Sequence, residues 1–142
     1  MTIWFRPYTI EEVQQHGRGT MLEYIDIHII EIGNDYLKGT MPVDHRTMQP
    51  MGILHGGASV VMAESLGSLA ASLVIDPQKN YCVGIDINAN HIRAVKAPAT
   101  VTGIARPIHL GSTTQVWGIE IKNEEGKLVC VSRLTMAILA HK

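Results

Sequence analysis

The longest apolar stretch of the chain, residues 54–75, follows a glycine-rich loop at residues 49–57. Glu64 is the only acidic residue of this stretch, and the rest are Gly, Ala, Ser, Leu, Val, Ile, Met and one His. A helix that is apolar on nearly all sides is normally buried in a core or in a membrane. The Ser and Gly interruptions and the acid in mid-run argue against a membrane span. The pattern therefore predicts one long helix in the core of the protein.

Segments in which polar and apolar residues alternate flank this helix, and they predict β-strands. Before the helix, capping signatures at residues 9–12 and 20–23 predict two short helices, and residues 26–32 and 36–43 predict a hairpin. After the helix, strands are expected at residues 81–89, 99–108, 113–122 and 128–139. In the first of these strands, Val83, Ile85 and Ile87 are expected on one face.

Strands that follow one another without crossover helices form an antiparallel sheet. We therefore predict an α+β fold in which an antiparallel sheet wraps around the central helix. The sheet covers only part of an apolar helix, and a second subunit can supply the rest, because Gly67, Ala70 and Ala71 permit close approach. No repeat or linker interrupts the chain, so residues 1–142 are expected to form a single domain.

The composition of the chain argues against several classes of function. The 142 residues carry a formal net charge of −1, without a basic run, and include only one Phe, two Trp and four Tyr. A nucleic-acid partner therefore has neither electrostatic nor stacking support. Cys82 and Cys130 lack C-x-x-C spacing, which indicates thiols in a reducing compartment. Residues 1–8 have no signal-peptide pattern, so a cytoplasmic location is expected.

The central helix carries two features with chemical potential. His55, Gly56 and Gly57 fall at its expected first turn, where free N–H groups and the positive dipole end stabilise an oxyanion or a polarised carbonyl. Glu64 lies further along, with Ser68 one turn beyond it on the same face. A carboxylate in apolar surroundings must be neutralised, paired or used. One helix thus offers an electrophile site at its start and an acid farther on.

The chain resembles the hotdog-fold acyl-CoA thioesterases over nearly its whole length. The resemblance rests on the segments 41–44, 49–57, 63–68, 86–93 and 115–117, and above all on the spacing from His55-Gly56-Gly57 to Glu64. It is strongest to the branch that contains 1,4-dihydroxy-2-naphthoyl-CoA hydrolase, an enzyme of menaquinone biosynthesis, and the proofreading thioesterase of enterobactin biosynthesis. This resemblance implies a homodimer with two active sites at its interface, and association of dimers into a homotetramer.

The resemblance also implies roles for individual residues. Glu64 is the catalytic carboxylate, either as nucleophile or as general base on water, and the Gly56 N–H polarises the thioester carbonyl. Gln49 and His55 help to position that carbonyl, and Ser68 orients Glu64 or the water. Glu64 comes from one subunit and the loop at residues 49–56 from the other. No serine nucleophile is needed, and the G-x-S-x-G elbow is absent.

A further set of residues is implied to contact the pantetheine and nucleotide of coenzyme A. Arg93 is the expected phosphate partner in this set. The turn before Gln115 departs from related sequences, which often carry an Arg there, so this chain offers less charge to the nucleotide. The implied contacts are Gly84, His91, Ile92, Arg93, Ala94, His109, Leu110, Gly111, Ser112, Thr113 and Thr114.

Simpler interpretations stay open for several of these residues. Glu64 is alternatively a paired structural acid, and Ser68 a small residue bonded to its own helix. His91 and Arg93 are alternatively solvated surface side chains. The seven histidines form no H-E-x-x-H pattern, so no metal is expected, and no cofactor is expected because coenzyme A belongs to the substrate. Two other functions fit the fold, namely a non-catalytic acyl-CoA sensor and a hotdog hydroxyacyl dehydratase.

Overall fold

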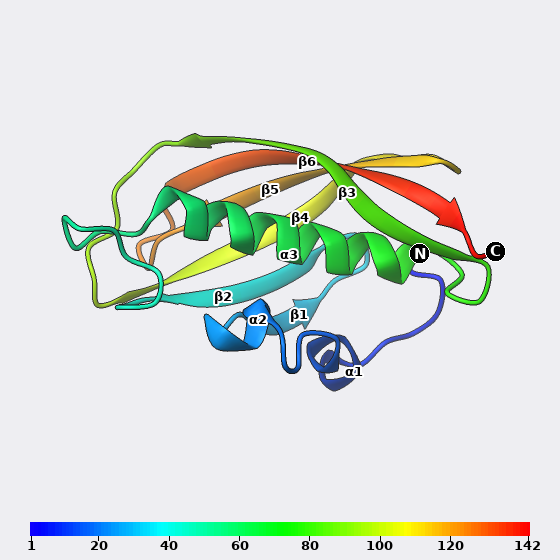
Figure 1. Cartoon of the computed structure of the whole chain (residues 1–142), viewed down its shortest axis with the longest axis horizontal. Coiled ribbons are helices and arrows are strands. Elements are labelled where there is room, and N and C mark those ends of the chain that lie inside the picture. The colour runs from blue at the N-terminus through cyan, green and yellow to red at the C-terminus, as the bar shows by residue number, and fades with distance from the viewer.

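One antiparallel sheet wraps around one long helix in the computed structural model, which describes residues 1–142 (Figure 1). The helix is α3 (Gly56–Val74). The strands are β1 (His28–Ile32), β2 (Leu37–Val43), β3 (Asn80–His91), β4 (Ala99–Leu110), β5 (Thr114–Lys122) and β6 (Leu128–Ala140). They form one six-stranded sheet in the order β1-β2-β4-β5-β6-β3, and every pairing is antiparallel. The predicted architecture is therefore confirmed.

Two short helices precede the sheet and lie beside β1, α1 (Ile10–Gln15) and α2 (Met21–Tyr24) (Figure 1). The predicted capping box at α1 is present, because Thr9 and Glu12 each accept a hydrogen bond from the other's backbone N–H. β1 begins at His28 rather than at residue 26, because Asp26 has a φ of 63°. This left-handed conformation is incompatible with an extended strand.

One face of α3 packs closely on the sheet. Its buried residues include Met62, Ala63, Leu66, Gly67, Ala70, Ala71 and Leu73. A Cβ built on Gly39 or on Gly103 would lie 2.8 Å from a Leu66 methyl carbon, so glycine in both strands permits this approach. By length and composition α3 could cross a membrane, but a core helix passes the same test.

The other face of α3 is not covered within one chain. Glu64, Ser65, Ser68 and Leu69 are only half-buried and line a surface pocket. The sheet therefore covers only part of the helix, as predicted, because one sheet can cover only one side of a helix.

β3 is an edge strand, and its side chains do not lie on the predicted faces of the sheet. Val83 and Ile85 are exposed, whereas Ile87 packs against the core. A β-bulge between Gly84 and Asp86 inserts Ile85 as an extra residue, which reverses the alternation on either side of it. The expectation that Val83, Ile85 and Ile87 share one face is therefore wrong. Sequence periodicity alone does not reveal an unpaired extra residue.

Two strands run farther than their sequence patterns indicated. β3 continues through His91, which pairs with Cys130 of β6. β4 continues through His109 and Leu110, which pair with Val116 and Gln115 of β5. The turn expected at residues 109–112 is therefore shorter. Hydrogen bonds to a neighbouring strand extend both strands beyond the residues that show the local alternating pattern.

The two cysteines are free thiols in apolar surroundings. Cys130 is buried and Cys82 is half-buried. Burial raises the pKa of both thiols above the ordinary value, which keeps them protonated and unreactive near neutral pH.

Candidate active site

The start of α3 is organised by His55, the N-cap residue. Nδ1 of its ring accepts a hydrogen bond of 2.7 Å from the Gly57 N–H, and its backbone N–H donates to the Thr47 carbonyl at 2.8 Å. Because Nδ1 is the acceptor, this bond assigns the ring proton of the neutral imidazole to Nε2, which is then a donor. The N–H of Gly56 stands at the first helical position and has no partner within the helix.

A pocket of about 310 Å³ opens at this helix start. We call it the helix-start pocket; its lining comprises Gln49, Ile53, Leu54, Gly56, Ser59, His91, Ile92, Arg93, Ala94 and Val129. The structure therefore brings Gln49 and Gly56 together with the segment 91–94. The contact is close, since a Cβ built on Gly56 would lie 2.7 Å from Nε2 of His91. Arg93 is exposed.

Glu64 lines a second pocket of about 310 Å³. We call it the acid pocket; its lining comprises His16, Thr20, Leu22, Glu64, Ser65, Ser68 and Leu69. None of the chain's ion pairs includes Glu64. Its carboxylate lies against β3, since a Cβ built on Gly84 would be 2.6 Å from Glu64 Oε1. The alternative of a salt-bridged structural acid therefore has no support within the chain.

Ser68 shares the acid pocket with Glu64, so their expected common face is confirmed. The Ser68 hydroxyl, however, donates to Sδ of Met136 at 3.8 Å rather than to Glu64. A thioether is a weak acceptor. Orientation of Glu64 by Ser68 is therefore not visible in the single chain.

The predicted residues form two groups that one chain does not bring together. Gly56 and Glu64 are about 12 Å apart along the helix axis and line different pockets. Strand register places the hairpin that joins β4 and β5 level with the acid pocket. Across the sheet, Leu110 pairs with Gln115, Gln115 pairs with Met136, and Met136 pairs with Gly84. The hairpin residues His109, Leu110, Gly111, Ser112, Thr113 and Thr114 line neither pocket.

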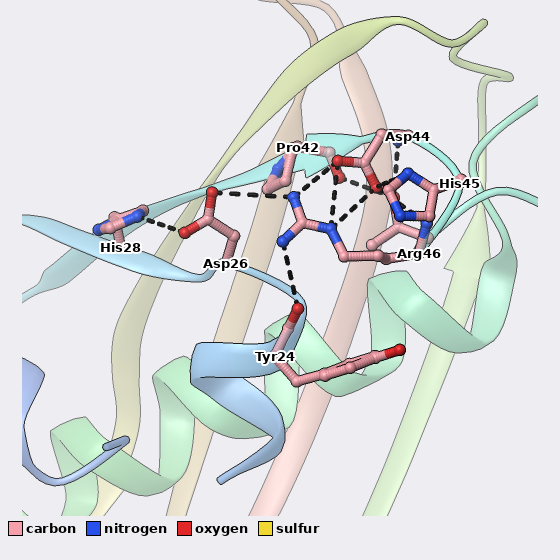
Figure 2. Close-up of polar contacts among 8 residues, drawn as sticks. Tyr24, Asp26, His28, Pro42, Asp44, His45 and Arg46 are labelled. Carbon is pink, nitrogen blue, oxygen red and sulfur yellow. Dashed lines mark hydrogen bonds and ion pairs between the residues drawn. The ribbon is translucent and has the colours of Figure 1, made fainter. Parts of the chain in front are cut away.

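A charged cluster fixes the loop that leads to α3 (Figure 2). Nη2 of Arg46 contacts Oδ2 of Asp44 at 2.7 Å and Oδ2 of Asp26 at 3.8 Å. Its Nη1 donates to the Tyr24 carbonyl at 3.2 Å. The Arg46 guanidinium lowers the pKa of Asp44 to about 2. These bonds tie the loop to the turn that follows α2.

Sequence reasoning missed two features of the site. His16, Thr20 and Leu22 come from the N-terminal segment but line the acid pocket, and no local pattern connects them to Glu64. The cluster around Arg46 was also missed, because its members are spread over residues 24–46. No group of three or more His, Cys, Asp or Glu side chains is arranged to hold a metal ion.

The sequence profile of the thioesterase superfamily matches residues 51–130. The chain belongs to the thioesterase superfamily. It is 52% identical over 137 residues to 1,4-dihydroxy-2-naphthoyl-CoA hydrolase of Escherichia coli, covering 96% of this chain and 99% of that protein. It is 46% identical to the proofreading thioesterase EntH of Cronobacter sakazakii, covering 96% of this chain and 98% of the relative.

Solved thioesterases have the same fold. A crystal structure of a Q49A variant of thioesterase PA1618 from Pseudomonas aeruginosa matches with a TM-score of 0.96 at 42% identity, covering 99% of this chain and 100% of that chain. Thioesterase HI1161 of Haemophilus influenzae matches with a TM-score of 0.94 at 47% identity, covering 98% and 96%. This member of the thioesterase superfamily therefore has the hotdog fold and is a thioester hydrolase.

Proposed function

We propose that this thioesterase hydrolyses an aromatic or similarly compact acyl-CoA ester, either 1,4-dihydroxy-2-naphthoyl-CoA or a benzoyl-type ester. High identity to the E. coli hydrolase over nearly the full length supports the first substrate and with it a place in menaquinone biosynthesis. The modest size of the acid pocket, about 310 Å³, favours a compact acyl group over a long chain.

The separation of the two pockets carries the proposal that each thioesterase site is shared between two subunits. A thioester carbonyl cannot contact the Gly56 N–H and the Glu64 carboxylate of one chain at once, because both belong to one rigid helix and are about 12 Å apart. In a homodimer the helix-start pocket of one subunit can face the acid pocket of the other. The uncovered face of α3 and the unpaired edge of β3 are the surfaces available for such pairing.

The proposed chemistry follows from this pairing. The Gly56 N–H of one subunit binds the carbonyl oxygen, assisted by the Gln49 amide and by the Nε2–H of His55. Negative charge develops on that oxygen during attack, and losing one such donor typically costs about 10²–10³ in rate. Glu64 of the other subunit attacks the carbonyl carbon directly or removes a proton from the attacking water, and Ser68 assists it. In the general-base route the carbon–sulfur bond breaks and the proton taken up by Glu64 passes to the coenzyme A thiolate. In the nucleophilic route the thiolate leaves as a mixed anhydride forms on Glu64; water then hydrolyses the anhydride, which frees the acyl group as its acid and regenerates the carboxylate.

The choice of Gln49 and Glu64 has support from related proteins. PA1618 has been crystallised as a Q49A variant. SAV0944 of Staphylococcus aureus, 39% identical to this chain, has been crystallised both as a Gln-to-Ala and as a Glu-to-Ala variant. Those two substituted positions are separated by as many residues as Gln49 and Glu64 are here.

For the coenzyme A end, we propose that Arg93 pairs with phosphate and that His91, Ile92 and Ala94 line the pantetheine path beside Gly56. These residues share the helix-start pocket, which supports a continuous channel to the carbonyl. Gly84 and the hairpin at residues 109–114 are proposed to complete the coenzyme A site from the neighbouring subunit. We further propose a cytoplasmic enzyme that works as a dimer of dimers and requires no cofactor.

Replacement of Glu64 tests the function. We expect Glu64→Gln and Glu64→Ala to lose nearly all thiol release from a panel of aromatic CoA esters, while Glu120→Gln, an exposed acid on β5, retains it. Unchanged hydrolysis in both Glu64 variants would remove the mechanism. Tight binding of acyl-CoA without any turnover by the unmodified protein would favour the sensor, and hydration of an enoyl-CoA would favour the dehydratase.

A further inference from the structure

The acid pocket has a wall that the proposed chemistry does not use. One side belongs to α3, with Glu64, Ser65, Ser68 and Leu69. The other side is supplied by the end of α1 and the start of α2, with His16, Thr20 and Leu22. Figure 1 shows both short helices next to β1 and β2, on the side away from β3. An acyl group whose carbonyl is next to Glu64 therefore meets the N-terminal segment.

This N-terminal wall is held firmly against the sheet. The Gln14 side chain donates to the Ile27 carbonyl at 3.0 Å and accepts from the Ile29 N–H at 2.7 Å. Val13 of α1 is fully buried in the core. A Cβ built on Gly17 would lie 3.0 Å from the Leu22 Cβ, so the turn is closely packed against the pocket lining. Such anchoring gives the wall a defined position for recognition.

Among the polar side chains of this wall, only His16 is free to bind a ligand. The Thr20 hydroxyl donates to the Gly17 carbonyl at 2.7 Å and accepts from the Leu22 N–H at 3.3 Å. The His16 imidazole forms no hydrogen bond and no ion pair within the chain, and only its backbone N–H is bonded, to the Val13 carbonyl at 3.2 Å. A neutral imidazole offers one donor and one acceptor.

We propose that His16 is a specificity-determining residue that hydrogen bonds to a polar substituent, such as a ring hydroxyl, on the acyl group. Leu22 and Leu69 contact the apolar part of the same group. The inference rests on the proposed function, because it assumes that the thioester carbonyl lies at Glu64. It adds a reason for preferring substituted over plain aromatic esters, namely a polar group on the pocket wall opposite α3.

The test compares benzoyl-CoA with the monohydroxybenzoyl-CoA isomers. We expect His16→Ala to lower kcat/KM about 10-fold for the preferred hydroxylated ester, the effect of one neutral hydrogen bond, and to leave benzoyl-CoA unchanged. His16→Asn, which keeps a donor and an acceptor, should retain part of the preference. His45→Ala is the matched control, because His45 is highly exposed and lines neither pocket.

Each other outcome has a defined meaning. Equal losses for both esters, or an unchanged ratio in His16→Ala, overturn the role of His16 while leaving the hydrolase intact. Lack of any preference in the unmodified enzyme overturns it too. If the unmodified enzyme hydrolyses none of the esters, the proposed function fails and the inference fails with it.

Discussion

Gly84 on the edge strand β3 lies directly against the carboxylate of Glu64 on α3. A Cβ built on Gly84 would be 2.6 Å from Oε1 of Glu64, closer than real Cβ contacts occur. Glycine inside a strand marks a place where another group approaches closely. Here the missing side chain leaves room for the proposed catalytic acid.

The substitution Gly84→Ala should therefore impair catalysis more than folding. The added methyl pushes aside the end of a flexible side chain, which costs little stability, but displacement of a reacting group by about 1 Å can cost about 10²-fold in rate. We expect kcat to fall by about 10- to 100-fold with Tm nearly unchanged. Gly118→Ala on β5 is the control, since its Cβ would meet the Ile108 side chain at 3.3 Å and the Arg106 carbonyl oxygen at 4.0 Å, both away from Glu64. Unchanged kcat in Gly84→Ala would contradict the assignment of Glu64.

Gly56 and His91 should be energetically coupled. The Cβ of an alanine at position 56 would lie 2.7 Å from Nε2 of His91, so Gly56→Ala must displace the imidazole. The backbone N–H is retained, so we expect a raised KM for acyl-CoA rather than loss of kcat. In a double-mutant cycle with His91→Ala, the coupling free energy for acyl-CoA binding should be about 1 kcal/mol. Additive effects of the two substitutions would show that the His91 ring and the methyl group of the alanine at position 56 do not compete for space.

Two inactive variants should restore activity to each other. A dimer of Glu64→Gln and Gln49→Ala subunits contains one site with both native residues if the sites are shared. Random subunit exchange should then recover about one quarter of the unmodified activity, because about half of the dimers are mixed and each has one intact site. A mixture of Glu64→Gln with Glu64→Ala is the control and should stay inactive. Failure to recover activity after exchange, verified with differently tagged subunits, would restrict the site to one chain.

The bond between Asp44 and Arg46 should make stability depend on acid pH. Arg46 lowers the pKa of Asp44 from 3.8 to about 2. A carboxylate with a lowered folded-state pKa stabilises the protein above its unfolded pKa and loses this effect as pH falls through the folded value. Asp44→Asn should lower the free energy of unfolding by about 1 kcal/mol at pH 7, a figure reduced for solvent screening.

Urea unfolding from pH 7 down to about pH 2 measures this difference, which should shrink between the two pKa values. Asp35→Asn is the control, because its ion pair with Arg106 at 3.2 Å is solvent-exposed on both sides. A constant difference between the unmodified protein and Asp44→Asn across this range would contradict the assigned pKa.

Local sequence determined most of the secondary structure. Periodicity identified the central helix and the strands, and the capping box at Thr9 and Glu12 identified the start of α1. The capping box depends on contacts within three residues, and the periodicity that marks a helix or a strand is a local pattern, so both can be recognised in the sequence. The bulge at Ile85 and the continuation of β4 through Leu110 depend on a partner strand, and they escaped prediction for that reason.

For the candidate site, the sequence by itself determined which residue types stand at the start of the helix and which acid stands farther along it. The i+4 spacing was sufficient to predict that Ser68 and Glu64 share a face. Only the tertiary structure decided that Glu64 lies against Gly84, that His16 completes its pocket, and that Gln49 and Gly56 open into a different one. These relationships join segments far apart in the chain, and packing and strand register, rather than local propensity, bring such segments together.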